Sequence, residues 1–376
     1  MLARVVLHIG TPKSGTTFLQ HALWANREAL EQAGVRLPGD LQRDMFWAAV
    51  EVGDAHGFWG LSADEIDGTW ARLCRQARDH DGVTVMSHEL LSGVEPEQAR
   101  AALAALDGVE LHVVVTVRDL ARQITSEWQE RVKNGGTRSY QQFQRRAARL
   151  LRQGRTSEGF WRHHDTVAIL DRWTAALPPQ QVHVVVAPPQ GADARILWER
   201  FGEACGFDAT GLDPDPPGAR KRTRNAALGV VQVQLLRAVN QALGGRIPQP
   251  AYARVVKDQF AERVLAAQRS QRPQATRAFT KTLRRVAKER NRTIRRRGYL
   301  VHGRLVELVP PPVDGVPSHP DDVTAEQLAA AYAEVVAAML VERAEERTRS
   351  WRRAVPDEDA PTLGRRLVRR LSRRRR

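Results

Sequence analysis

The segment from Gly10 to Thr17 constrains what this chain can fold into more than any other. It reads GTPKSGTT and directly follows Leu2–Ile9, a segment rich in apolar and β-branched residues. A buried strand that runs through a glycine- and serine-containing turn into a helix makes an anion-binding loop, because the N–H groups of the turn and the positive end of the helix dipole point at one site. The sequence therefore predicts a strand, a phosphate-binding turn and a helix over Thr16–Ala33.

The position of the lysine sets this loop apart from that of P-loop kinases. Gly10 and Gly15 keep the spacing of the G-x-x-x-x-G-K-[ST] pattern, but Thr16 and Thr17 stand where that pattern has its lysine and hydroxyl residue. The lysine lies inside the loop, at Lys13. Kinases hold Mg²⁺ against a highly charged triphosphate with a hydroxyl and an acidic residue. A sulfuryl group carries less charge, so a lysine and backbone dipoles can support its transfer without a metal, and we expect no metal here.

A second informative segment lies further along the chain. Leu111–Val117 (LHVVVTV) is a near-continuous apolar run, typical of a strand buried on both faces of a parallel sheet. Arg118 follows at its C-terminal tip, where open α/β sheets bind ligands. The amphipathic segment Leu120–Lys133 is predicted to be a helix, and Ser126 lies about two turns into it.

Taken together, these two segments resemble those of sulfotransferases that use 3′-phosphoadenosine 5′-phosphosulfate. GTPKSGTT is similar to their 5′-phosphosulfate loop, and VTVRDLARQITSEW is similar to the element that holds the 3′-phosphate. The resemblance extends less specifically through Phe160–Trp173, the helix from Arg224 onward and Arg297–Pro310, as in bacterial members of the family. It implies that the nucleotide is bound by Lys13, Ser14, Gly15, Thr16, Thr17, Arg118 and Ser126. It also implies in-line transfer of a sulfuryl group to the hydroxyl, or amine, of a glycan, glycolipid or small molecule.

Such a transfer needs a base for the acceptor. Val83–Met86 is predicted to be a short strand, and Ser87, His88 and Glu89 follow at its end. The resemblance places the base at this strand end, as histidine in cytosolic sulfotransferases and as glutamate in many that modify glycans. Neighbouring residues at a strand end face opposite ways, so we expect only one of the two to reach the acceptor. We favour Glu89, because Ser87-x-Glu89 after this strand resembles the bacterial members, and keep His88 as the alternative.

Strands that alternate with helices predict an α/β fold, with a P-loop-type parallel sheet flanked by helices and a helical C-terminal region. We expect an α/β nucleotide-binding core over 1–207, a helical part of the same domain over 208–355 and a disordered basic tail over 356–376. The remaining expected strand is Gln181–Ala187. The remaining expected helices are Glu97–Leu106, Tyr140–Arg152, Asp165–Ala176, Ala192–Cys205, Asn225–Leu243, Tyr252–Arg269 and Thr324–Arg352.

Composition indicates where the protein is located, and it leaves two other classes of protein open. Two cysteines among 376 residues are too few for a disulfide framework, and no apolar run approaches the ~18 residues of a membrane span, so we expect a cytoplasmic protein. The net charge of +15 includes eight arginines in the tail 365–376, which can lie peripherally on an anionic membrane or remain solvated. No specific nucleic-acid motif is present. A divergent P-loop kinase and a non-enzymatic basic, anion-binding protein are the alternatives.

The acceptor is not defined by sequence. The segment 44–60 contains Phe46, Trp47, Phe58 and Trp59, which can either stack on a sugar or lipid or pack a lid onto the core. Both readings stay open at this level.

Overall fold

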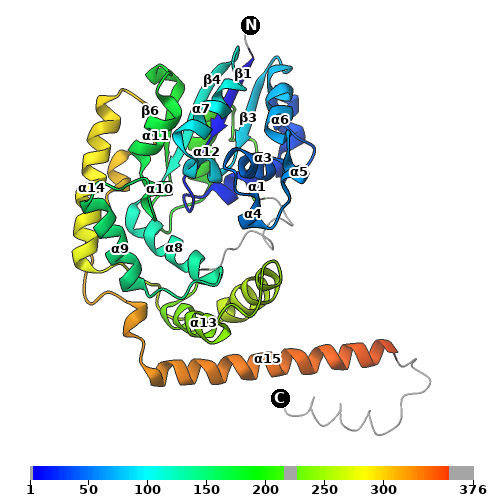
Figure 1. The fold of residues 1–376 in the computed structure, drawn as a ribbon, viewed down its shortest axis with the longest axis vertical. Coiled ribbons are helices and arrows are strands. Elements are labelled where there is room, and N and C mark those ends of the chain that lie inside the picture. The colour runs from blue at the N-terminus through cyan, green and yellow to red at the C-terminus, as the bar shows by residue number, and fades with distance from the viewer. Residues whose placement is uncertain (1–2, 216–226, 355–376) are drawn as a thin grey trace.

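The computed structural model describes residues 3–215 and 227–354, without the side chains of residues 349–354. The basic tail expected over 356–376 lies outside these residues. In the described part, six parallel strands form one sheet with helices on both faces (Figure 1). The strands are β1 Arg4–His8, β2 Val35–Arg36, β3 Val83–Ser87, β4 Glu110–Val117, β5 Val182–Val186 and β6 Leu300–His302. Their order is β2-β3-β1-β4-β5-β6, so the α/β fold class with a parallel sheet is confirmed.

Helices make up most of the rest of the described residues. The α-helices before β5 are α1 Thr16–Ala25, α2 Arg27–Gln32, α3 Asp44–Val52, α4 His56–Trp59, α5 Ala63–Ile66, α6 Thr69–Arg78, α7 Pro96–Ala104, α8 Leu120–Lys133, α9 Tyr140–Arg152, α10 Trp161–His164 and α11 Thr166–Thr174. Those after β5 are α12 Arg195–Cys205, α13 Val230–Leu243, α14 Arg277–Arg296 and α15 Ala325–Ala354. A π-helix, η4 Ala253–Val264, continues as the short 3₁₀-helix η5 Leu265–Ala267.

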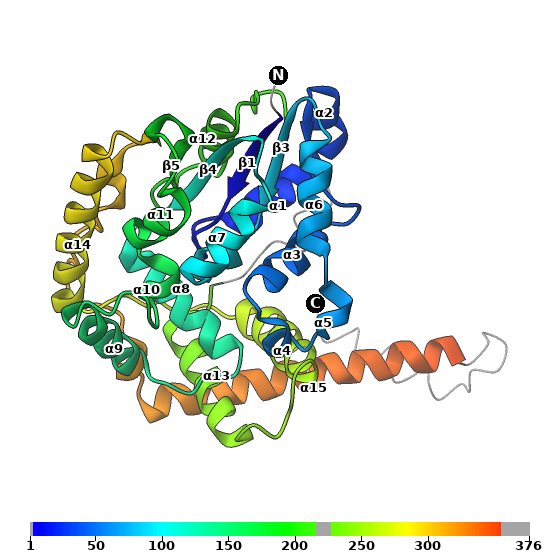
Figure 2. The same cartoon turned by 45° about the horizontal axis from the view of Figure 1, so that its top comes forward.

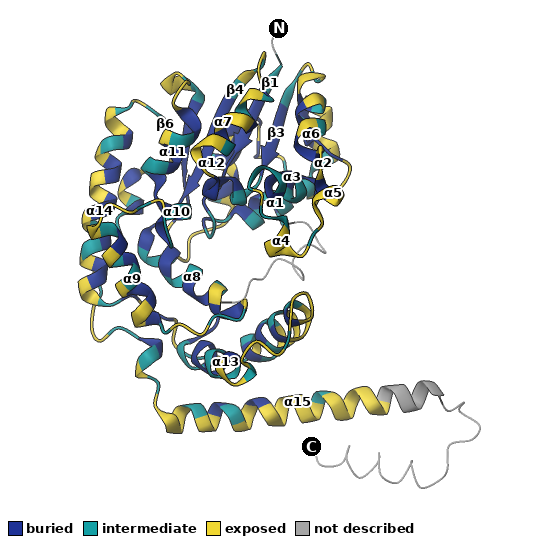
Figure 3. Cartoon of the chain, viewed as in Figure 1, coloured by how far each residue is buried: buried dark blue, intermediate teal, exposed yellow. Residues whose placement is uncertain are grey.

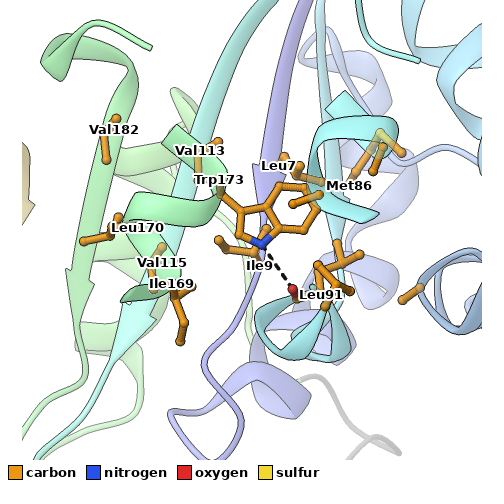
Figure 4. Packing of buried hydrophobic residues seen from close by; sticks show 14 of the residues in the cluster. Leu7, Ile9, Met86, Leu91, Val113, Val115, Ile169, Leu170, Trp173 and Val182 are labelled. Carbon is orange, nitrogen blue, oxygen red and sulfur yellow. Dashed lines mark hydrogen bonds between the residues drawn. The ribbon is translucent and has the colours of Figure 1, made fainter. Parts of the chain in front are cut away.

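Successive side chains of a strand point to opposite faces of the sheet, and a different set of helices packs against each face. On β1, Val5 and Leu7 join a cluster with residues of α3, α6, α7 and α11, whereas Val6 packs with residues of α1 and α12. Trp173 of α11 is fully buried over the first of these faces and donates its indole N–H to the Leu91 carbonyl oxygen at 3.1 Å (Figure 4). Burial of each such large side chain contributes about 1.5–3 kcal/mol.

A third buried cluster joins α8 and α9 to the C-terminal helices α13, η4, α14 and α15. Figure 2 shows α13 and α15 beyond the end of the sheet to which β1 points and α14 along one side, and Figure 3 shows that much of α15 is exposed. The C-terminal part also supplies β6, which pairs with β5. No helix in the described ranges combines the length and apolarity needed to cross a bilayer.

Several expected helices differ from the observed ones at their ends. The helix predicted over Thr16–Ala33 is broken at Asn26, whose backbone leaves the helical region at φ −107° and ψ 16°. The Asn26 side-chain amide there donates to the carbonyl oxygens of Ala22 and Asp213, both at 2.8 Å. The helix expected from Asn225 begins at Val230, with residues 225 and 226 outside the described ranges.

Candidate functional site

Three strand ends meet at one edge of the sheet and carry the residues that the sequence singled out. The phosphate loop follows β1, His88 and Glu89 follow β3, and Arg118 follows β4. The strands are neighbours in the order β3-β1-β4, so these segments lie side by side. This is the edge where parallel α/β sheets bind their ligands.

The phosphate loop is shaped by residues with left-handed backbone conformations. Gly10, Lys13 and Gly15 have φ values of 96°, 63° and 101°, which favour glycine at the two outer positions. The loop is joined to β4 by two short bonds, from Thr11 N to Thr116 O at 2.7 Å and from Thr116 N to Gly10 O at 2.6 Å.

The loop ends at the N-terminus of α1, where backbone donors remain available. Gly15 is the N-cap residue and provides no side-chain cap. Within the described ranges, the N–H groups of Gly15, Thr16 and Thr17 donate to no backbone acceptor, as is usual for the first turn of a helix. Convergent, unpaired N–H groups at a helix N-terminus are a site for an anion.

A buried polar network supports the loop from below. The Ser14 hydroxyl donates to the Thr11 carbonyl oxygen at 2.5 Å and lies 2.6 Å from the Thr116 hydroxyl. The His8 ring joins the Thr116 hydroxyl at 3.1 Å to the Ser87 hydroxyl at 2.8 Å, so the ends of β1, β3 and β4 are linked. The Ser14 side chain therefore holds the loop in shape, and its contact with a nucleotide stays a prediction.

Arg118 connects the two sequence motifs directly. Its Nη1 donates to the carbonyl oxygen of Lys13 at 2.9 Å. Its Nε is buried and has no hydrogen-bond partner among the described residues. Burial, together with the charges of Arg122 and Arg272, lowers the pKa of Arg118 to about 10, although Asp119 opposes this effect. Arg118 and Arg122 act on the Asp119 carboxylate, and the charge of Arg272 acts on both of these arginines, so an anion bound here would offset their repulsion.

One face of α8 lies toward the loop. Gln123 donates from its side-chain amide to the Thr11 hydroxyl at 2.6 Å. Ser126 follows three residues later on the same face. It is half-buried, and its hydroxyl has no hydrogen-bond partner in the described part of the chain. Ser126 thus lies on the same face of α8 as Gln123, and its contact with a ligand stays a prediction.

The Lys13 side chain is held by a carboxylate of the same helix. Its Nζ lies 2.8 Å from Oε2 of Glu130, while Lys257 from η4 lies 2.7 Å from Oε1. Burial raises the pKa of Glu130, but the two ammonium groups outweigh it and lower that pKa to about 2. Glu130 therefore stays ionised and forms ion pairs with both Lys13 of the loop and Lys257 of the C-terminal part.

The two candidate bases lie against the opposite side of the loop. A Cβ atom added to Gly10 would lie 3.0 Å from Glu89 Cα, so the absence of a side chain at Gly10 lets the two backbones approach. The Glu89 carboxylate accepts a hydrogen bond from the Gln20 amide at 2.7 Å. Burial raises the pKa of Glu89, but His88, a backbone bond and Gln20 together hold it below its ordinary value. Burial lowers the pKa of His88, so at neutral pH a carboxylate stands beside a neutral imidazole.

Sequence reasoning missed several residues that the fold brings to this edge. They are Gln123, Glu130 and Arg122 on α8, and Lys257 and Arg272 from the C-terminal part. The α8 residues recur at intervals of three or four around Ser126, so a helical-face reading of Leu120–Lys133 would have found them. In the described ranges, no group of three or more His, Cys, Asp or Glu side chains is arranged to hold a metal ion.

Comparison with known proteins does not establish a family for this chain. No family model matches the chain, and no curated protein matches it. Among solved structures, it is similar to a sulfotransferase from Alicyclobacillus acidocaldarius, with 15% identity, a TM-score of 0.39, and coverage of 64% of this chain and 94% of that chain. The function has to be argued from the residues of the site.

The buried histidines near this edge predict that the protein is sensitive to acid. Burial lowers the pKa of His8 to about 3 and that of His163 to about 4. The unfolded chain takes up protons below about pH 6.5 that the folded chain does not, so the free energy of unfolding should fall from there toward pH 4, by about 1.4 kcal/mol per pH unit for each group. Urea unfolding at pH 7.5 and pH 5 tests this. His163→Gln should weaken the dependence and the control His56→Gln should not; equal stability at both pH values would contradict it.

Proposed function

We propose that this protein is a sulfotransferase that transfers the sulfuryl group of 3′-phosphoadenosine 5′-phosphosulfate to an acceptor hydroxyl or amine. The observation that carries the proposal is the bond from Arg118 to the Lys13 carbonyl, because it brings the two sequence motifs into direct contact. The buried, unpaired Nε of Arg118 and the free N–H groups of the loop support a ligand with two separate anionic groups.

The residues divide between binding and chemistry. Arg118 and Ser126 would hold the 3′-phosphate, and the N–H groups of Gly15, Thr16 and Thr17 would hold the 5′ side. The bound nucleotide supplies the activated sulfuryl group. Glu89 or His88 accepts the proton of the acceptor hydroxyl as its oxygen bonds to sulfur. Lys13 stabilises the charge that the leaving phosphate oxygen gains when its bond to sulfur breaks.

Isothermal titration with 3′,5′-adenosine bisphosphate tests the binding half of this proposal. We expect binding in the presence of EDTA, with no increase on addition of Mg²⁺. Arg118→Met should weaken it about 10- to 100-fold, the equivalent of one or two hydrogen bonds to a charged group. The exposed Arg145 provides the control Arg145→Met, which should bind normally.

The same titration separates the proposal from its competitors. Binding of ATP that depends on Mg²⁺, without binding of the bisphosphate, would favour a divergent kinase. Equal weakening by Arg118→Met and Arg145→Met would indicate general attraction of anions to a basic protein.

A further inference from the structure

A pocket of about 410 Å³ lies beside the end of β3, next to the candidate bases. Its walls come from α1, the segment after β2, α3 and the end of β3. Gln20 and His88 are among its lining residues, and Gln20 is the residue that holds the Glu89 carboxylate. A molecule in this pocket would therefore contact His88 directly and, through Gln20, lie one hydrogen bond from the Glu89 carboxylate.

The lining of this pocket is more apolar than polar. Seven of its thirteen residues are apolar, among them Trp24, Met45 and Phe46, and none is Asp or Glu. The charged side chain in the lining is Arg43, which is exposed and stacks on Trp47. A pocket of this kind binds the apolar body of a ligand and orients it with a few polar groups.

Three polar side chains near the end of β3 each already have one hydrogen-bond partner within the protein. The Ser87 hydroxyl is bonded to His8, and His88 Nδ1 accepts the N–H of Leu90 at 3.3 Å. The Gln20 amide is bonded to Glu89. A ligand with many hydroxyl groups would lose bonds to water that this end does not replace, which costs free energy for each unpaired group.

Aromatic rings continue from the pocket to the surface. Phe46 lies 5.6 Å from the His88 ring and packs edge-on against Trp59, with 5.2 Å between centroids. Phe58 packs edge-on against Trp59 at the same separation, and the two rings are 79% and 44% exposed. Through Trp59, these exposed rings are in contact with a residue of the apolar pocket, so an apolar ligand that extended onto them would remove apolar surface from water.

From these contacts we infer that the pocket binds the acceptor, and that the acceptor is a phenol or another alcohol with a largely apolar body and no positive charge. This inference rests on the proposed function. The hydroxyl lies at the His88 and Glu89 end, and the apolar body lies between Trp24 and Phe46. Its outer part extends over Trp59. A cationic body is disfavoured because it would face Arg43 with no carboxylate in the lining.

The first test uses the unmodified protein and three probes. 2-Naphthol, tyramine and N-acetylglucosamine are supplied separately with 3′-phosphoadenosine 5′-phosphosulfate, and release of the bisphosphate is measured. We expect kcat/KM for 2-naphthol to exceed that for each of the others at least tenfold. A preference for the sugar or for the cationic tyramine would overturn the inference.

The second test measures binding of 2-naphthol without the nucleotide. Phe46→Ala should weaken binding about tenfold, which corresponds to about 1.4 kcal/mol of lost contact. Trp59→Ala, at an exposed position that should not disturb folding, should weaken it severalfold. Leu41→Ala is the matched control, because Leu41 is exposed nearby and does not line the pocket.

The outcomes separate this inference from the proposed function. Unchanged affinity for 2-naphthol in both Phe46→Ala and Trp59→Ala would overturn the pocket assignment, even if the bisphosphate binds. Loss of bisphosphate binding with normal 2-naphthol binding would refute the sulfotransferase and keep the apolar pocket. Bisphosphate affinity that stays constant across the three variants, with weaker naphthol binding in two, supports both.

Discussion

Lys13→Ala is expected to lower the rate of sulfuryl transfer by about 10²- to 10³-fold while the protein stays folded. The Lys13 ammonium is the cation of the phosphate loop, and removal of one preorganised stabilising group costs about 10²- to 10³-fold in kcat. The fold should survive because the Glu130 carboxylate keeps Lys257 as an ammonium partner when Lys13 is removed. Single-turnover assays and thermal unfolding of the variant measure the two effects separately.

Lys257→Ala is the matched control for this experiment. It also removes an ammonium group from Glu130, at a similar distance, but Lys257 belongs to η4 and not to the loop. We expect its activity to stay within a few-fold of the parent protein. Near-normal turnover by Lys13→Ala would refute the assignment of the loop. An equal loss in both variants would show that neutralisation of Glu130 matters and that Lys13 has no separate role.

Much of the sheet could be predicted because its strands are short, apolar and bounded by turn residues. Strands buried on both faces read as continuous valine-rich runs, and β4 and β5 were found within one residue at each end. Two edge strands, β2 and β6, were not predicted. They have two and three residues, too few for a periodic pattern, and form because the neighbouring strand offers unpaired backbone groups.

The helices show which features could be predicted from the local sequence pattern and which could not. The bounds of α8 and α9 agree with prediction, because each has a regular apolar stripe and Asp119 or Ser139 as a capping side chain. The segment Tyr252–Arg269 was expected to be an ordinary helix, yet its first part is the π-helix η4. Residues of η4 pack into the third buried cluster, and this packing cannot be inferred from the spacing of apolar residues in the segment.

The grouping of residues at this edge could be predicted where each residue follows a strand of the sheet, and it was missed where distant segments meet. Lys13, Arg118 and Glu89 each follow a strand of the same parallel sheet, so topology alone brings them to one edge. Lys257 and Arg272 come from the C-terminal part, and their approach depends on how that part packs against α8. Single-sequence reasoning has no access to such packing.

The aromatic residues of segment 44–60 differ in their surroundings, and whether any of them stacks on a ligand stays a prediction. Trp47 lies beneath the Arg43 guanidinium and is absent from the pocket lining. Phe46 lines the pocket, while Phe58 and Trp59 remain largely or partly exposed. The surroundings of each ring depend on which face of α3 or of the short α4 it occupies, and composition does not reveal this.

Glu89→Gln is expected to lower kcat by 10²-fold or more, within the range of about 10²–10⁴ for loss of a general base. Glutamine keeps the size of the side chain and can still accept the Gln20 bond through its carbonyl oxygen, so folding and nucleotide binding should be retained. His88→Asn should retain most activity. Steady-state kinetics with the acceptor at saturation measure kcat, and the exposed Glu97 supplies the control Glu97→Gln.

The pH profile gives the same prediction a second, independent readout. His88, a backbone bond and Gln20 hold the pKa of Glu89 below its ordinary value of 4.5, so this carboxylate is ionised across neutral pH. If Glu89 is the base, kcat should stay level as pH falls from 8 to 5 and decline only as pH approaches that lowered pKa. His88→Asn removes one of the groups that lower this pKa, so in that variant the acid limb should move to higher pH. A large loss in His88→Asn with full activity in Glu89→Gln would instead assign the base to His88.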